Sequence, residues 1–273
     1  MLVARQVHAL KLGGSILTYP DKKPDNLDEL TDLPQLFMRS RDEIKRYGQE
    51  IAEAQETNSS KDGYELWISH GVKQWGHDAV GFLGVVPEVS KYCAHFNKLI
   101  VEILEETGLA LEPIDPALTC SWNQDLKTFE VTDMLKKGRN AFRKGRIPVS
   151  WGTVVPQLPA GHAIMSGDDT LLYTGLLRRA DEGIMFLDVP VSDKDPKSHP
   201  GDSKPIKLLR SHRELSATVD RRDKTGGLIG KIAKMELLAL SGTRCQIVDA
   251  TPPGNIRKAL TGETIGTVIQ PDI

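Results

Sequence analysis

The stretch 7-VHALKLGGS-15 sets an apolar run directly before two glycines and a serine. Val7 to Leu12 is typical of a short buried strand, and a lysine inside such a strand, Lys11, is costly to bury unless its ammonium meets an anion. Gly13, Gly14 and Ser15 can turn backbone N–H groups toward phosphate oxygens, because no bulky side chain intervenes. The stretch is either a phosphate-binding loop or a glycine turn beside an exposed lysine. Its spacing is not that of a Walker A loop.

Outside this stretch, apolar runs of strand length alternate with segments of helical periodicity. The alternation predicts an α/β fold, a three-layer αβα sandwich with a mostly parallel central sheet. The length suits a single domain over residues 1–273 or two fused lobes. The predicted strands are 7–12, 66–69, 147–151, 183–189, 246–249 and 266–270. The predicted helices are 33–57, 89–107, 131–144, 169–179, 230–240 and 255–260, with polar loops at 19–30 and 192–206. Ligands of such sheets bind beyond the carboxyl ends of the strands, so the loops there deserve inspection.

The bulk composition excludes several function classes. Charged residues make up 26% of the 273 residues and the net charge is -2, so no global positive field favours nucleic acid or an anionic membrane. No apolar run reaches spanning length, and the first five residues lead into a strand without a secretory apolar region. Three cysteines far apart indicate free thiols in a reducing compartment. We expect a cytoplasmic protein with neither nucleic-acid nor membrane partners.

A second candidate loop, Ser166-Gly167-Asp168-Asp169-Thr170, opens a predicted helix. One of its two acids can be explained as a helix N-cap. Two adjacent carboxylates after a glycine exceed what capping needs. One of them could hold a lysine in position or bind a magnesium-nucleotide complex.

A third candidate loop, 223–231, carries a Thr-Gly-Gly turn into a helix, whose N-terminus favours anions. Lys231 lies four residues past Gly227 and could reach the same anion. The alternative is a flexible loop with a solvated lysine. For the terminal stretch 259–269, ALTGETIGTVI, a structural role is expected.

The stretch 67-WISHGVKQWGH-77 runs from a strand into a loop with two histidines. It could be a metal site, a phosphate-binding loop or a polar turn. Six residues separate His70 from His77 and no third ligand is close in sequence, so we expect no metal site here. Trp75, Phe82 and Leu83 could line an apolar substrate pocket or belong to the core.

Six motifs, taken in order, resemble the amino acid kinase superfamily over nearly the whole chain, and most closely its isopentenyl phosphate kinase branch. They are KLGGS (11–15), HG....GH (70–77), IPVSWGTVV (147–155), IMSGDD (164–169), DKTGGLIGKI (223–232) and ALTGETIGTVI (259–269). The resemblance implies ATP-dependent phosphorylation of a small phosphate monoester, isopentenyl phosphate to isopentenyl diphosphate, in isoprenoid biosynthesis. It also implies ATP and Mg²⁺ as cofactors, a homodimer, an acceptor-binding lobe over about 1–160 and a nucleotide-binding lobe over about 161–273.

The alternatives are a kinase of another small anion (a phosphonate, carboxylate or carbamate) and a non-catalytic nucleotide-binding homologue. Residue by residue, the resemblance implies that Lys11, Asp168 and Lys231 are catalytic. The implied acceptor-binding residues are Gly71, Val72, His77 and Gly167. The implied nucleotide-binding residues are Lys11, Gly13, Gly14, Ser15, Lys73, Asp188, Gly227 and Lys231. No residue is implied as a protein ligand to a metal.

The stretch 70–77 departs from the pattern His-Gly-Gly-Gly-Ser-Phe-Gly-His of the branch. Val72 and Lys73 stand where the second and third glycines are expected. A β-branched residue resists positive φ, so the loop is expected to offer a different N–H cradle. Either Lys73 replaces lost amide donors with a charge, or the acceptor differs from isopentenyl phosphate.

Overall fold

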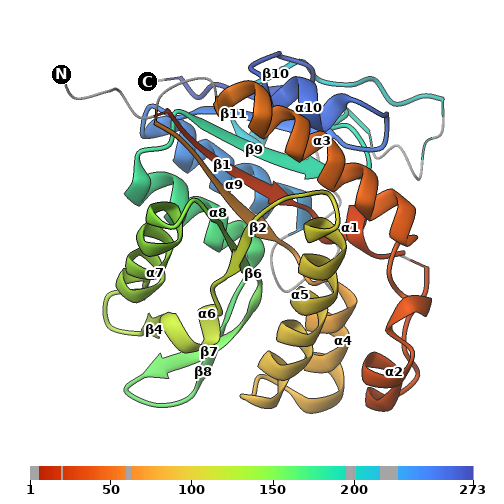
Figure 1. Cartoon of the computed structure of the whole chain (residues 1–273), viewed down its shortest axis with the longest axis vertical. Helices are drawn as coiled ribbons and strands as arrows, with labels where there is room; N and C mark the ends of the chain where they lie inside the picture. The colour runs from red at the N-terminus through yellow and green to blue at the C-terminus, as the bar shows by residue number, and fades with distance from the viewer. Residues whose placement is uncertain are drawn as a thin grey trace.

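The computed structural model describes residues 6–19, 21–59, 63–194, 199, 201–215 and 227–272. Its main sheet has eight strands, with the N-terminal strand β1 near the centre (Figure 1). In spatial order they are β10 (Leu208–Leu209), β12 (Thr267–Ile269), β11 (Arg244–Asp249), β9 (Glu182–Leu187), β1 (Gln6–Leu12), β2 (Tyr64–His70), β6 (Ile147–Trp151) and β3 (Leu111–Pro113). All neighbouring pairs are parallel except β11 with β12. The prediction of a mostly parallel sheet is therefore confirmed.

Alternate residues of β1 point to opposite faces of the sheet, and each face is covered by helices. Leu10 and Leu12 belong to the core under α3 (Arg41–Ser59) and α5 (Glu88–Glu105). Val7 and Ala9 belong to the core under α8 (Gly167–Arg178) and α9 (Gly227–Leu240). Strand alternation places Lys11 on the second face, the α8 and α9 side. The three-layer αβα sandwich is confirmed.

The register of the sheet brings the predicted functional loops together. Leu12, the last residue of β1, pairs with His70 at the end of β2 and with Phe186 near the end of β9. Because these strands are parallel, the loops that follow them leave the sheet at the same edge. Gly13 donates its N–H to Phe186 O (2.9 Å) and Gly71 donates to Leu12 O (2.9 Å), which ties the loops to one another.

A smaller sheet extends the molecule beyond the main one (Figure 1). It consists of β5 (Thr128–Glu130), β4 (Ser121–Asn123), β7 (Thr153–Leu158) and β8 (His162–Met165). The remaining helical elements are α1 (Gly14–Leu17), α2 (Leu27–Asp32), η1 (Pro34–Leu36), α4 (Gln74–Leu83), α6 (Pro116–Thr119), α7 (Thr132–Arg143), η2 (His212–Glu214) and α10 (Asn255–Leu260). Strand β8 leads directly into α8, so this sheet contributes to the same edge as β1 and β2.

Three predicted boundaries are wrong. The helix expected at 33–57 begins only at Arg41, because Ser40 and Glu43 form a reciprocal capping pair, each side chain accepting the other's backbone N–H (3.2 Å). The loop expected at 19–30 contains the start of α2, which Asn26 caps. The polar loop after His70 becomes α4 at Gln74. Within the predicted loop 192–206, Ser192 and Pro205 form an isolated bridge, and residues 195–198 and 200 lie outside the described residues. Residues 223–226, on which the predicted Thr-Gly-Gly turn partly falls, also lie outside them.

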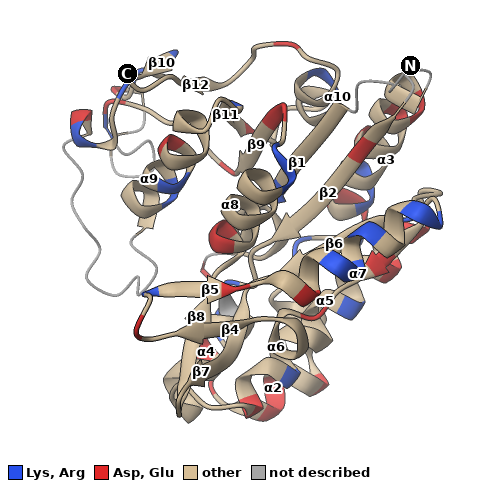
Figure 2. Ribbon diagram, turned by 90° about the vertical axis from the view of Figure 1, so that its left-hand side faces the viewer, with Lys and Arg blue, Asp and Glu red and all other residues tan. Residues whose placement is uncertain are grey.

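The surface carries both signs of charge. Figure 2 shows Lys and Arg interspersed with Asp and Glu over the helices, with basic residues concentrated on α7. Among the described residues, no helix is both long and apolar enough to span a bilayer. Both observations agree with the mixed composition of the sequence.

Candidate active site

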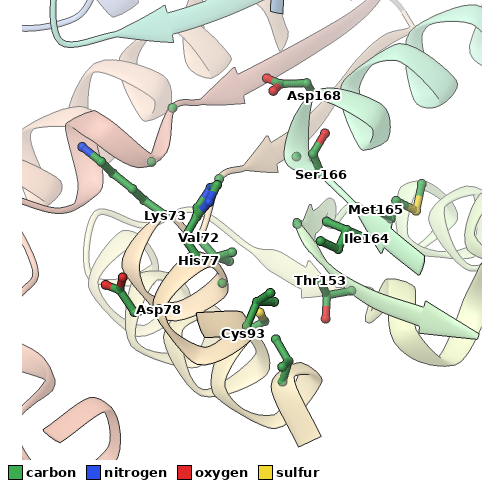
Figure 3. Close-up of a pocket in the computed structure, with 18 of the residues that line it drawn as sticks. Val72, Lys73, His77, Asp78, Cys93, Thr153, Ile164, Met165, Ser166 and Asp168 are labelled. Atoms are coloured by element: carbon green, nitrogen blue, oxygen red, sulfur yellow. The ribbon is translucent and has the colours of Figure 1, made fainter. Parts of the chain in front are cut away.

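A cavity of about 470 Å³ opens where the loops after β1, β2 and β8 meet. Its polar end contains Lys11, the glycine turn Gly13–Ser15, Gly71 and Asp168, and Lys231 reaches it from α9. Figure 3 shows Val72 and His77 on one side of the cavity, Thr153 and Ile164 on the other, and Asp168 above them at the start of α8. Sequence segments far apart in the chain thus contribute to one site, as the strand-end argument predicts.

The polar end is organised around a buried ion pair. Lys11 Nζ lies 2.7 Å from Asp168 Oδ1, and these side chains are only 3% and 4% exposed. Lys231 Nζ lies 3.8 Å from the other carboxylate oxygen of Asp168 and also donates to Gly227 O (3.3 Å). We call Lys11, Asp168 and Lys231 the ion-pair cluster. Lys11 is therefore not an exposed lysine beside a glycine turn, and this alternative is excluded.

The cluster keeps its carboxylate ionised. Burial alone would raise the pKa of Asp168, but the neighbouring ammonium groups, Lys11 first and then Lys231, lower it to about 2. Burial lowers the pKa of Lys11, an effect that Asp168 opposes and Lys231 reinforces. Two cations converge on one carboxylate, so the cluster carries a positive charge that a phosphate group could neutralise.

The two adjacent acids of the second loop have separate roles. Ser166 and Asp169 form a capping box at the start of α8, with Ser166 Oγ accepting from Asp169 N (3.2 Å) and Asp169 Oδ2 accepting from Ser166 N (2.8 Å). Asp168 stays available for the ion-pair cluster. The prediction that two carboxylates exceed what capping needs is therefore confirmed.

Lys234 is a cation that sequence reasoning missed. Its Nζ lies 2.7 Å from Asp169 Oδ1 and donates to Ser166 Oγ (3.0 Å), so α9 is fastened to the capping box of α8. Lys234 follows Lys231 by three residues, which puts both on the same face of a helix. That spacing was the available signal. Lys234 also contributes to lowering the pKa of both Lys11 and Asp168.

The loop after β2 differs from expectation in where its strain lies. Val72 does not have a positive φ, whereas Lys73, the N-cap of α4, has φ 36° and ψ -106°. A Cβ added to Gly14 would lie 2.8 Å from Lys73 Cβ, so the two loops meet where Gly14 has no side chain. Non-glycine residues rarely adopt this conformation, which costs free energy.

The Lys73→Gly variant is expected to raise the free energy of unfolding by about 1 kcal/mol, because relief of the strained φ outweighs the extra chain entropy of glycine. Urea denaturation measures the change. Lys73→Ala is the matched control, since it removes the same charge but keeps the Cβ. A Lys73→Gly variant less stable than Lys73→Ala would show that the backbone at residue 73 is unstrained, because only the chain entropy of glycine would then separate them.

His77 lines the cavity from the first turn of α4 and is exposed. Its neighbour Asp78 also lines the cavity and was not expected there. Burial raises the pKa of Asp78, although Lys23, His77 and Lys73 oppose the rise. Lys23, like Asp78, lines the cavity and was missed, because nothing in the sequence near residues 19–30 indicates which side chain turns inward.

The other end of the cavity is mainly apolar. It is lined by Val80, Val89, Cys93, Val154 and Ile164, together with the hydroxyl-bearing Thr153. Trp75 does not line it; the indole is fully buried and stacks on Phe96, with ring centroids 4.6 Å apart. Phe82 and Leu83 are also absent from the lining. Of the two alternatives for Trp75, the structure supports the core.

Most residues expected at the site lie around this cavity. Lys11, Gly13, Gly14, Ser15, Gly71, Val72, Lys73, His77, Gly167, Asp168 and Lys231 line it. Asp188 and Gly227 are not among the lining residues; Leu187, next to Asp188, is. The binding roles of all these residues remain predictions.

Comparison with known proteins gives one consistent result. The profile of the Amino acid kinase family matches residues 6–249. Isopentenyl phosphate kinase of Methanothermobacter thermautotrophicus is 27% identical over 288 residues, which cover 94% of this chain and 96% of that protein. The enzyme of the same name from Haloferax volcanii is 27% identical over 96% of this chain and 97% of its own length. Glutamate 5-kinase of a Cyanothece species is 37% identical over only 38% of this chain and 30% of that protein.

Solved structures agree on the fold. An X-ray structure of isopentenyl phosphate kinase superposes with a TM-score of 0.74 at 24% identity, covering 97% of this chain and all of that chain. The UMP kinase of Ureaplasma parvum superposes with a TM-score of 0.57 at 13% identity, over 98% of this chain and 99% of its own. The family profile covers most of the chain and the fold agrees with it, so this protein belongs to the amino acid kinase family.

Proposed function

We propose that the protein transfers the γ-phosphoryl group of ATP to isopentenyl phosphate, giving isopentenyl diphosphate and ADP. The observation that carries the proposal is the two-ended cavity, with the ion-pair cluster at one end and apolar side chains at the other. A phosphate monoester with a short hydrocarbon tail matches both ends. The curated relatives that align over almost the whole chain carry the name isopentenyl phosphate kinase, which supports the same acceptor.

Phosphoryl transfer at this site would require neutralisation of the phosphate charges and alignment of the acceptor with the γ-phosphoryl group. An acceptor phosphate oxygen is already ionised at neutral pH, so no general base has to remove a proton from it. Lys11 and Lys231 would stabilise the charge on the transferring group, and Asp168 would hold their ammonium groups in place. His77 would donate an imidazole N–H to the acceptor phosphate from the first turn of α4.

Backbone donors would complete the site. Gly13, Gly14 and Ser15 line the cavity beside Lys11, where their N–H groups and the Ser15 hydroxyl are proposed to contact nucleotide phosphates. Gly227, at the start of α9, and Asp188, after β9, are proposed on the nucleotide side, together with Lys73. The acceptor side would be formed by Gly71, Val72 and Gly167.

Mg²⁺ is proposed to enter with the nucleotide. The described residues contain no group of three or more His, Cys, Asp or Glu side chains that could hold an ion by themselves. Asp168 and Asp169 are ion-paired with Lys11 and Lys234 respectively. This fits Mg²⁺, which in phosphoryl-transfer sites is held largely by phosphates and water. When bound, the ion would neutralise charge on the β- and γ-phosphates.

Two finer proposals concern the state of the protein. The three cysteines are all free and buried, which agrees with a reducing, cytoplasmic location. A homodimer is proposed from the family resemblance. Light scattering of the purified chain at several concentrations would distinguish a dimer from a monomer.

The function is tested by a coupled assay of ADP release with isopentenyl phosphate, ATP and Mg²⁺, with Lys11→Ala as background. We expect isopentenyl phosphate-dependent turnover at least about 100-fold above that background, since Lys11 would contact the transferring group. A panel of phosphonates, carboxylates and carbamates is assayed in parallel, because glutamate 5-kinase is also a partial relative. Turnover with a compound of that panel but not with isopentenyl phosphate would identify a different small anion as the acceptor. ATP binding without turnover of any compound would identify the protein as a non-catalytic nucleotide-binding homologue.

A further inference from the structure

His70 is a fully buried histidine to which the proposed chemistry gives no role. It directly precedes residues 71–73, the connection between β2 and α4, which we call the acceptor loop. It closes β2 but does not line the cavity. Its ring lies parallel to Trp151, with centroids 6.3 Å apart and planes at 18°, and meets the edge of Phe96. Both ring nitrogens face oxygen atoms: Nδ1 lies 3.3 Å from Gly71 O, and Nε2 lies 3.0 Å from Asn97 Oδ1 on α5.

These neighbours determine where the imidazole carries its proton. Burial lowers the pKa of His70 despite the Asn97 and Gly71 contacts, and the nearby Lys11 charge lowers it further, so the ring is neutral at physiological pH. A backbone carbonyl only accepts, so the contact with Gly71 O requires the proton on Nδ1. A neutral ring has one donor, so with Asn97 Oδ1 facing Nε2 only one of the two contacts can be a hydrogen bond. Turning the Asn97 amide by 180° presents its NH₂ group to Nε2 and satisfies both contacts, because the carbonyl of Gly71 has no such freedom.

The contact with His70 fixes the orientation of the Gly71–Val72 peptide. Glycine at 71 leaves either orientation of this peptide sterically open, and the Nδ1–H to Gly71 O bond selects one. In a trans peptide the carbonyl and the following N–H point in opposite directions. Gly71 O points toward buried His70, so Val72 N–H points the other way, to the side where Gly71 and Val72 line the cavity. Among the hydrogen bonds of the described residues, none is donated by this N–H.

Two neighbouring hydrogen bonds restrain the peptide between His70 and Gly71. His70 O accepts from Gly152 N (3.1 Å), and Gly71 N donates to Leu12 O (2.9 Å). They do not restrain the next peptide, Gly71–Val72, whose orientation therefore depends on the contact with His70. We infer that His70 and Asn97 are positioning residues, which hold the Gly71–Val72 peptide so that Val72 N–H faces the acceptor's phosphate. The positioning role follows from the geometry, and only the identity of the acceptor, isopentenyl phosphate, rests on the proposed function.

The pair His70→Asn and His70→Gln tests the kinetic consequence. The asparagine amide nitrogen can occupy the place of Nδ1 and keep the bond to Gly71 O, whereas the glutamine amide reaches the place of Nε2. Both variants lose the stacking on Trp151 alike, so each controls for the other. His70→Gln should raise the KM for isopentenyl phosphate roughly tenfold, as loss of an oriented hydrogen bond to an anion does, with the KM for ATP unchanged. His70→Asn should stay within about threefold of the parent KM. Equal acceptor KM values in the two variants would overturn the inference.

A spectroscopic measurement on the unmutated protein tests the geometry without any turnover. In uniformly ¹⁵N-labelled protein, the two-bond ¹H–¹⁵N correlations of the imidazole should show His70 as the neutral Nδ1–H tautomer. The Val72 amide resonance should shift on addition of inorganic phosphate. An Nε2–H tautomer, or an unshifted Val72 amide under saturating phosphate, would refute the positioning role. If isopentenyl phosphate is not turned over but the tautomer and the shift are found, the proposed function fails and the inference stands for another phosphate acceptor.

Discussion

Lys11→Met is expected to lower kcat/KM for the phosphoryl transfer by about 10³-fold, the effect of removing a preorganised positive group from a buried transition-state site. Lys11 is 2% exposed, and its ammonium is fixed 2.7 Å from Asp168 at the polar end of the cavity. Water cannot easily replace a charge at such a depth. The ADP-release assay measures the loss, with ATP and acceptor both varied so that kcat and KM are separated.

The same substitution leaves Asp168 buried with only Lys231, at 3.8 Å, as a partner. Loss of one member of a buried pair costs about 3–5 kcal/mol of stability, so a fall in activity alone could reflect unfolding. The double variant Lys11→Met, Asp168→Asn removes both charges and should recover much of the free energy of unfolding. It should recover none of the activity. Recovered activity in the double variant would show that Lys11 acts on the fold and not on the reaction.

The order of the elements could be predicted from the sequence because local patterns and the overall fold agree. Buried strands such as Ile147–Trp151 are almost wholly apolar, and the helix Asn255–Leu260 is bounded by Gly254 and Thr261. Both appear at the expected residues. The boundary at Arg41 was missed although the capping signal Ser40-x-x-Glu43 is present, because the apolar Leu33 and Leu36 simulate an earlier start. In the structure those two leucines are about half exposed and belong to no long helix.

The polar half of the site was predictable and the apolar half was not. Lys11 is the second-to-last residue of β1, and Asp168 and Lys231 lie in the first turns of α8 and α9. The parallel sheet therefore brings them to the same edge. Val89, Cys93 and Ile164 line the cavity only because α4 and α5 lie opposite β7 and β8. Strands of the small sheet are as short as three residues and lie in polar segments, for which periodicity gives no signal. The packing that sets the shape of the apolar end of the cavity therefore had to come from the structure.

Gly167→Ala is expected to reduce both stability and acceptor binding, because the new methyl group has no space. A Cβ at this position would lie 2.4 Å from His70 O and 3.1 Å from Gly71 N. Those atoms are backbone, and each is held by a hydrogen bond, to Gly152 N and to Leu12 O respectively, so neither can move without disturbing the acceptor loop. Overpacking against fixed backbone costs about 1–3 kcal/mol, and we expect the upper part of this range in urea denaturation.

The loop displaced in Gly167→Ala contains Gly71 and Val72. The KM for the acceptor should therefore rise at least about tenfold, because an ångström-scale misplacement of a binding group has an effect of this size. The KM for ATP should change little. Gly81→Ala is the matched control for stability: a Cβ at residue 81, inside α4, meets nothing within 4 Å. The free energy of unfolding of Gly81→Ala should be about 0.5–1 kcal/mol higher than that of the parent, because alanine is favoured over glycine within a helix. If Gly167→Ala proved as stable as the parent and bound the acceptor equally well, the close contact between α8 and the acceptor loop would have no part in forming the site.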